Sequence, residues 1–248
     1  MKTRLLCILS LLFSSFVGLS KEGGSESPIS LYESSRAAGK VGDVQKLALL
    51  YHPRELERFK KAVQVAFTSD SDEPLFANLR AIMAPLEKDD LEGKSAEELL
   101  AKFQQKLIEA RGGKEAIVQL QPEVLGVIKE SDVLSHVIVR PMKEIARSRP
   151  EPTSVEKVGN QWYLLFNSQL NLLITEILGE KKEVEAFYQA LGFVKDGDIS
   201  QVLVRSCVAG NIVQVRCYPV RAGDEAWEFL SNETLPELIE AMKRKWGL

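Results

Sequence analysis

Apolar residues in the first half of the chain recur every three or four positions, which is the spacing of one face of an α-helix. The clearest run follows Pro53, where Leu56, Phe59 and Val63 share one stripe. Side chains that cap free backbone N–H groups indicate where such helices begin. The predicted starts are Ser27-Pro28, Asp43, His52-Pro53, Leu75 for a short helix, and a capping box of Ser95 with Glu98. We therefore expect a helical block that ends at Gly112-Gly113.

Beyond this point the period shortens to about two, the spacing of β-strands. Strands are predicted over 124–129, 134–140, 155–158 and 161–166, with turns at 130–132 and at Gly159-Asn160. Helical spacing returns over 170–178, and a further helix is assigned to 183–191. A hairpin over 201–220 and a last helix, opened by Thr234 with Glu237, follow. No repeat with a period of about 20–50 residues stands out, and the order of elements predicts an α+β fold.

The last predicted hairpin carries two cysteines. With its turn at Gly210-Asn211, a dipeptide suited to a type II′ turn, Val204 pairs with Cys217. Cys207 then points to the opposite face, so a disulfide cannot form within the hairpin. A slip of one residue would bring both cysteines to one face, but about four residues apart, roughly 13 Å by strand rise. We expect two unpaired cysteines in either register.

The beginning of the chain differs in composition from the rest. Lys2 and Arg4 precede an apolar run from Leu5 to Val17, and Gly18-Leu19-Ser20 supplies the small residues of a cleavage site. This order is typical of a secretory signal peptide over residues 1–20. The run is shorter than the roughly 20 apolar residues of a transmembrane helix. We predict export of a soluble chain to the periplasm or the extracellular space, with residues 21–27 as a flexible leader.

The charge balance narrows the function classes. Asp and Glu number 35 against 32 Lys and Arg, and the bases are scattered along the 248 residues. A nucleic-acid-binding protein would carry a clustered basic footprint. We therefore expect no nucleic-acid partner and no permanent membrane span.

Most catalytic motifs are missing from the sequence. It contains two histidines, His52 and His136, and no Cys-x-x-Cys or His-Glu-x-x-His spacing, so no standard zinc site is expected. Gly-x-Ser-x-Gly, Walker and dinucleotide loops are also missing, and Asp196-Gly197-Asp198 lacks the remaining ligands of a calcium loop. We predict no cofactor and no metal.

A few residues could still carry acid–base chemistry. His136 and Arg140 share one face of a predicted strand with Val137 and Val139 on the other; valines in the core would leave both polar side chains solvated. Tyr163 is a further candidate. His52 precedes a proline and is expected to cap the next helix.

Three segments resemble the secreted bacterial nuclear transport factor 2-like (ketosteroid-isomerase-like) family. They are AAGKVGD (37–43), HVIVR (136–140) and VEKVGNQWYLLF (155–166). The resemblance covers residues 28–180 and implies a cone: helices packed on a curved antiparallel sheet, with a pocket at the wide end and often a homodimer. Residues 181–248 fall outside it and are predicted to form a C-terminal extension of helix, β-hairpin and helix.

The family hosts isomerases, dehydratases and members without known activity, so the fold alone transfers little function. Our leading hypothesis is a non-catalytic exported module that binds a small apolar molecule or a partner protein. Tyr32, Tyr51 and Trp162 are core residues in one interpretation and pocket walls in the other. One alternative is a lyase or isomerase using His136 as acid or base, with Arg140 or Tyr163 as its partner. The other is a structural, envelope-associated scaffold.

Overall fold

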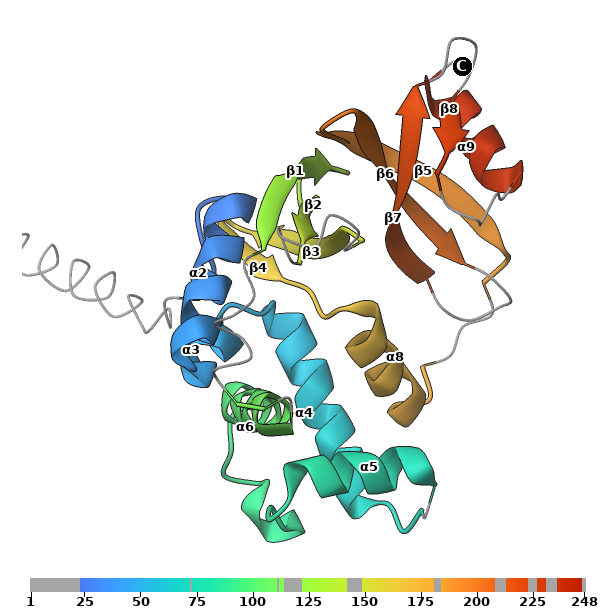
Figure 1. Cartoon of the computed structure of the whole chain (residues 1–248). Coiled ribbons are helices and arrows are strands. Elements are labelled where there is room, and N and C mark those ends of the chain that lie inside the picture. The colour runs from blue at the N-terminus through green and yellow to red at the C-terminus, as the bar shows by residue number, and fades with distance from the viewer. Residues whose placement is uncertain are drawn as a thin grey trace, which may run out of the picture.

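Helices fill the first half of the chain and two antiparallel sheets dominate the second, so the α+β class is confirmed (Figure 1). The computed structural model describes residues 23–71, 73–110, 112–113, 122–141, 149–180, 184–207, 213–222, 227–230 and 236–246. The predicted signal peptide, the turn at Gly210-Asn211 and the capping residue Thr234 lie outside the described residues.

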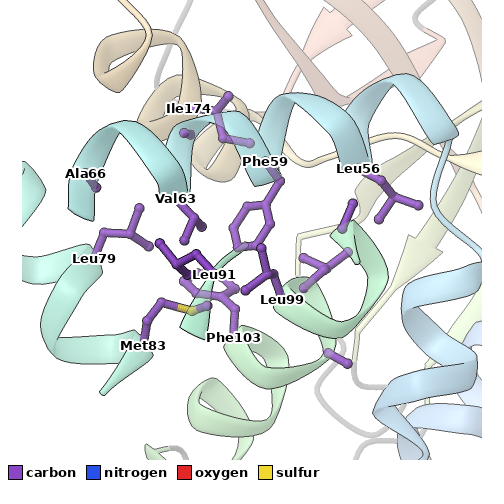
Figure 2. Packing of buried hydrophobic residues seen from close by; sticks show 14 of the residues in the cluster. Leu56, Phe59, Val63, Ala66, Leu79, Met83, Leu91, Leu99, Phe103 and Ile174 are labelled. Atoms are coloured by element: carbon purple, nitrogen blue, oxygen red, sulfur yellow. The ribbon is translucent and has the colours of Figure 1, made fainter. Parts of the chain in front are cut away.

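The helical block is built from amphipathic helices with one buried stripe each. They are α2 (Pro28–Val41), α3 (Val44–Leu49), α4 (Pro53–Thr68), α5 (Pro74–Met83) and α6 (Ala96–Ala110), with a short 3₁₀ helix, η2 (Lys88–Asp90). A further α-helix, α8 (Ser168–Ile177), follows the first sheet and packs on α4 and α5. Figure 2 shows side chains of these helices interlocking around Phe59 in one apolar core. Burial of these stripes, rather than helix propensity, holds such short helices together.

Four of the predicted helix starts are confirmed by the hydrogen bonds of their caps. Ser27 accepts from the backbone N–H of Ser30, and Asp43 from that of Lys46. His52 Nδ1 accepts from the N–H of Arg54 at 3.0 Å. Ser95 Oγ accepts from the N–H of Glu98, whose carboxylate accepts from the N–H of Ser95.

The described part of the leader differs from the flexible segment that the sequence predicts. Ser25 pairs with Trp162 as an antiparallel bridge, with N···O distances of 3.0 and 2.7 Å. A Cβ on Gly23 would lie 2.4 Å from the carbonyl oxygen of Leu49. Because its backbone extends a sheet edge and lies close to a neighbouring chain segment, this stretch is part of the fold.

The first sheet is a meander of four antiparallel strands. Its strands are β1 (Glu123–Lys129), β2 (Leu134–Arg140), β3 (Glu151–Val158) and β4 (Gln161–Leu164), in the order β1-β2-β3-β4. Both predicted hairpins are confirmed, including the turn at Gly159, whose φ of 59° suits glycine. β3 begins at Glu151, four residues before the predicted start.

The second sheet corrects the prediction for residues 181–248. It has four antiparallel strands in the order β5-β6-β7-β8: β5 (Phe187–Asp196), β6 (Ile199–Cys207), β7 (Val213–Ala222) and β8 (Trp227–Phe229). The helix predicted over 183–191 is wrong, because β5 occupies most of it. The predicted hairpin is therefore the centre of a larger sheet, and α9 (Pro236–Trp246) packs on its outer face against β5.

The register of β6 with β7 is one residue away from the predicted one. Cys207 pairs with Val213 and Leu203 with Cys217, so both cysteines point to the same face. Both are unpaired and buried, as expected. Burial raises the pKa of the Cys217 thiol to about 12.

The two sheets pack face to face through an apolar cluster. Ile128 and Ile138 of the first sheet meet Leu191, Val194, Leu203 and Cys217 of the second. Gly126 and Gly192 allow the close approach: a Cβ at Gly126 would lie 2.9 Å from Val194, and one at Gly192 would lie 2.7 Å from Ile128. Each glycine follows a β-bulge in its strand.

These reciprocal contacts come from an internal duplication. LGVIKESDVLSHVIVR (125–140) recurs, with one residue deleted, as LGFVKDGDISQVLVR (191–205). The likeness continues into the helices that follow each sheet, where Leu173, Ile174 and Ile177 correspond to Leu238, Ile239 and Met242. Each copy is a four-stranded meander and a helix. The copies pack differently: α9 covers its own sheet, whereas α2 lies against the first sheet and α8 joins the helical block (Figure 1).

Candidate functional site

The side chain of His136 lies between the two sheets and is 1% exposed. Its Nε2 is 2.8 Å from Glu130 Oε2, and its Nδ1 is 3.0 Å from Ser154 Oγ on the neighbouring strand β3. A carboxylate can only accept, so the neutral ring carries its proton on Nε2 and Nδ1 accepts from the Ser154 hydroxyl. Burial lowers the pKa of His136, although Glu130 acts in the opposite direction.

Glu130 is shared between His136 and the second sheet. Arg205 on β6 donates to both carboxylate oxygens of Glu130, at 2.5 Å each. The sequence indicates His136 but not its partners, which come from the turn after β1, from β3 and from the second repeat.

Arg140, on the first sheet, makes the equivalent contact with an acid of the second sheet. It donates to Asp196, at the end of β5, and to Glu123 at 2.6 Å. Gln201 donates to the other oxygen of Asp196 at 2.9 Å. The hydrogen bond that Arg140 donates to Asp196 is the main reason that the pKa of Arg140 is raised.

These contacts form an inter-sheet latch with two equivalent halves. Half one is Glu130, His136 and Arg205; half two is Asp196, Gln201 and Arg140. In the duplicated sequence Glu130 corresponds to Asp196, His136 to Gln201 and Arg140 to Arg205. Each acid therefore binds the arginine of the other copy, as in a two-fold symmetric interface.

The latch overturns the expectation that His136 and Arg140 are solvated. Val137 and Val139 are buried as that expectation required, but the opposite face of β2 is covered by the second sheet. The structure does not bring His136 together with Arg140 or Tyr163 in one site: Arg140 joins half two of the latch, and Tyr163 lies near His52.

A recess of about 130 Å³ opens where the leader, α4, α6 and β4 meet. Two tyrosines and two glutamates are among the residues that line it. Its lining residues are Gly23, Leu49, Tyr51, Pro53, Leu56, Glu57, Glu97 and Tyr163. Tyr51 and Tyr163 are sequence candidates that the structure thus brings together, whereas Glu57 and Glu97 carried no sequence signal as site residues.

The two tyrosines are held in different ways. Tyr51 bridges to Leu164, and its ring centroid is 5.1 Å from that of Phe166. Its burial raises the pKa of the phenol. The Tyr163 ring meets the imidazole of His52 edge-on, with centroids 6.1 Å apart.

The other predicted pocket residues lie elsewhere. Trp162 is buried in a cluster with Leu31 and Val155, on the face of β4 opposite to Tyr163. Tyr32, on α2, is half-buried and is not part of the recess lining, and its burial raises the pKa of its phenol.

Within the described residues, no group of three or more His, Cys, Asp or Glu is arranged to hold a metal ion. No described helix is long and apolar enough to cross a bilayer. Comparison with family models, with curated proteins and with solved structures produced no match.

Proposed function

We propose that this protein is a non-catalytic binding module that takes a compact organic cation in the recess between Tyr51 and Tyr163. The observation that carries the proposal is that two tyrosines and two glutamates are among the residues that line one small cavity. Aromatic faces attract cations electrostatically, by about 0.5–2 kcal/mol depending on exposure to water. The exposed Glu57 adds negative charge to the same opening.

The size of the recess limits the ligand. A volume of about 130 Å³ accommodates a small quaternary or tertiary amine and excludes a cofactor or a peptide. Leu49, Pro53 and Leu56 supply apolar contacts for the methyl groups of such an ion. The ligand class is therefore an apolar body with one positive charge.

The interior of the β half supports a non-catalytic role. The space between the sheets is filled by the cluster around Ile138 and Leu203. The polar atoms of His136 and Arg140 are bound by neighbouring side chains. A proton-transfer residue needs access to the proton that it moves.

Binding of a matched pair of probes tests this proposal. Choline and 3,3-dimethyl-1-butanol have nearly the same shape, but only choline carries a charge. Isothermal titration should show choline binding about 2- to 30-fold more tightly than the alcohol. Tyr163→Leu should remove this preference, and Tyr32→Leu, outside the recess, should leave it intact. Equal binding of the two probes, or none by either, would contradict the proposal.

A second candidate function is a lyase or isomerase with His136 as acid or base. Ser154, His136 and Glu130 form a hydrogen-bonded chain that resembles an activated nucleophile and its base. Diethylpyrocarbonate, which acylates accessible neutral imidazoles, separates the candidates. The binding proposal predicts that His136 is protected in the folded protein, and rapid acylation there would favour the enzyme.

Export after cleavage near residue 20 and membership of residues 28–180 in the nuclear transport factor 2-like family remain proposals. The element order that motivates the family is helices followed by antiparallel strands. A homodimer, and an envelope-associated scaffold with residues 181–248 as contact surface, also stay proposals. Native mass spectrometry of the exported protein would report the cleavage site, the oligomeric state and any retained ligand together.

A further inference from the structure

The two halves of the latch differ in one residue that titrates near neutral pH. Half one holds its acid with His136 and half two holds its acid with Gln201. Glutamine keeps one protonation state at all pH values, whereas a solvated histidine changes charge near pH 6.5. Half two, with Gln201, therefore serves as a reference against which the pH response of half one, with His136, can be compared.

We propose that His136 makes the contact between the two sheets acid-sensitive, so that protonation of this ring loosens half one of the latch while half two, built on Gln201, holds. This proposal is independent of the ligand in the recess.

The hydrogen bonds around His136 fit a neutral ring. Nε2–H donates to Glu130, and Nδ1 accepts from Ser154. A proton on Nδ1 would face the hydrogen that the Ser154 hydroxyl donates, so this bond must reverse. The added charge would also lie beside Arg205, which binds the same carboxylate.

The charged groups that face the ring act in opposite directions. Glu130, from the turn after β1, favours a protonated ring, and Arg205, from β6, opposes it. Ser154 is the polar neighbour on β3, and the paired position on β1 is the apolar Ile128. Burial is the largest influence and lowers the pKa of His136 below its ordinary 6.5.

The direction of the effect follows from linkage. The closed interface prefers a neutral ring, whereas a ring exposed by opening titrates at its ordinary value. The interface is therefore most stable above pH 6.5 and weakens as the pH falls below that value. At pH 5 an exposed ring with a pKa of 6.5 favours opening by a factor of at most roughly 30.

Cys217 offers a native reporter of opening. It lies in the cluster between the sheets and is 1% exposed. Cleavage after Arg205, Arg216 and Arg221 by trypsin places Cys217 and Cys207 on separate peptides. Labelling of the full chain with 4,4′-dithiodipyridine, followed by digestion without reductant and mass spectrometry, therefore measures the two thiols individually.

The decisive comparison is between wild type and His136→Gln at the same pH. The reaction of the reagent with thiols depends on pH in the same way in both proteins, so this dependence cancels in the ratio of their rates. The labelling rate of Cys217 in wild type, divided by that in His136→Gln, should be near one at pH 7.5 and should rise severalfold at pH 5. Gln201→His, which gives half two its own histidine, should label faster than wild type at pH 5. His52→Asn, which removes the other histidine, should retain the response of wild type.

Two results would overturn the proposal: an equal pH response in wild type and His136→Gln, or no added response in Gln201→His. If circular dichroism shows that His136→Gln does not fold at pH 7.5, the comparison of Gln201→His with wild type decides.

Discussion

At the residue scale, the two glycines at the sheet interface set how closely the copies approach. The Cβ positions of Gly126 and Gly192 are occupied by side chains of the opposite sheet. Each glycine thus receives a branched side chain, Val194 or Ile128, from the other copy. This exchange is what the duplication contributes to packing.

Gly192→Ala tests this close approach. The added methyl group would lie 2.7 Å from Ile128 in a filled interior, and overpacking of this kind costs about 1–3 kcal/mol of unfolding free energy. Gly39→Ala is the matched control, because a Cβ there meets nothing within 4 Å in helix α2. Urea denaturation should show a loss for the first and a gain of about 0.5–1 kcal/mol for the second. A neutral Gly192→Ala would mean that the sheets are not in contact there.

The cap formed by His52 gives a second prediction. Its Nδ1 must be unprotonated to accept from Arg54, and burial lowers the pKa of the ring. The cap is therefore complete above pH 6.5 and is lost as the pH falls further. His52→Ala should cost about 1 kcal/mol at pH 7.5. His52→Asn should keep the cap and lose less stability than wild type between pH 7.5 and 5, as measured by urea denaturation at each pH.

Local signals made the caps predictable from sequence. Each depends on a few neighbouring residues, such as Ser95 with Glu98, and the four predicted caps that lie in the described residues formed as expected. The partners of His136 were not predictable in this way, because Arg205 is 69 positions away along the chain and is brought near only by sheet packing.

At the element scale, β5 shows where periodicity misleads. Val184, Phe187 and Leu191 recur at helical spacing, and a short apolar run fits a helix or a strand equally well. The correspondence of LGFVK (191–195) with LGVIK (125–129), which is predicted as a strand, is the signal that would have identified β5. The two segments start 66 positions apart, farther than the period of about 20–50 residues of common repeat proteins. The β6–β7 register differs by one residue from the predicted one because a turn signal alone does not fix how two strands pair.

The latch makes a prediction about how elements are joined. Glu130→Gln leaves Arg205 without its carboxylate, and Asp196→Asn leaves Arg140 with only the more exposed Glu123, so each should cost about 1–3 kcal/mol of unfolding free energy. Glu123→Gln, at a more exposed carboxylate on the same Arg140, should cost less than 1 kcal/mol. Thermal or urea unfolding measures all three. Equal effects for Glu123 and Asp196 would contradict the assignment of the latch.

At the scale of the whole molecule, the β half and the junction of leader, helices and β4 differ in what their charged residues do. The duplicated β half uses its charged residues to hold two sheets together. The junction of leader, helices and β4 provides a small, charged opening. The sequence predicted the α+β class and two of the recess residues, but the recess itself depends on how the leader docks, which no local pattern encodes.

An NMR titration of the ¹⁵N-labelled protein with choline tests cation binding in the recess. We expect the amide signals that shift to belong to residues around the recess, such as Tyr51, Glu57, Glu97 and Tyr163. Signals of Glu130, His136 and Ser154 should stay unchanged. Shifts centred on these three residues, or no saturable shifts at all, would contradict the proposed function.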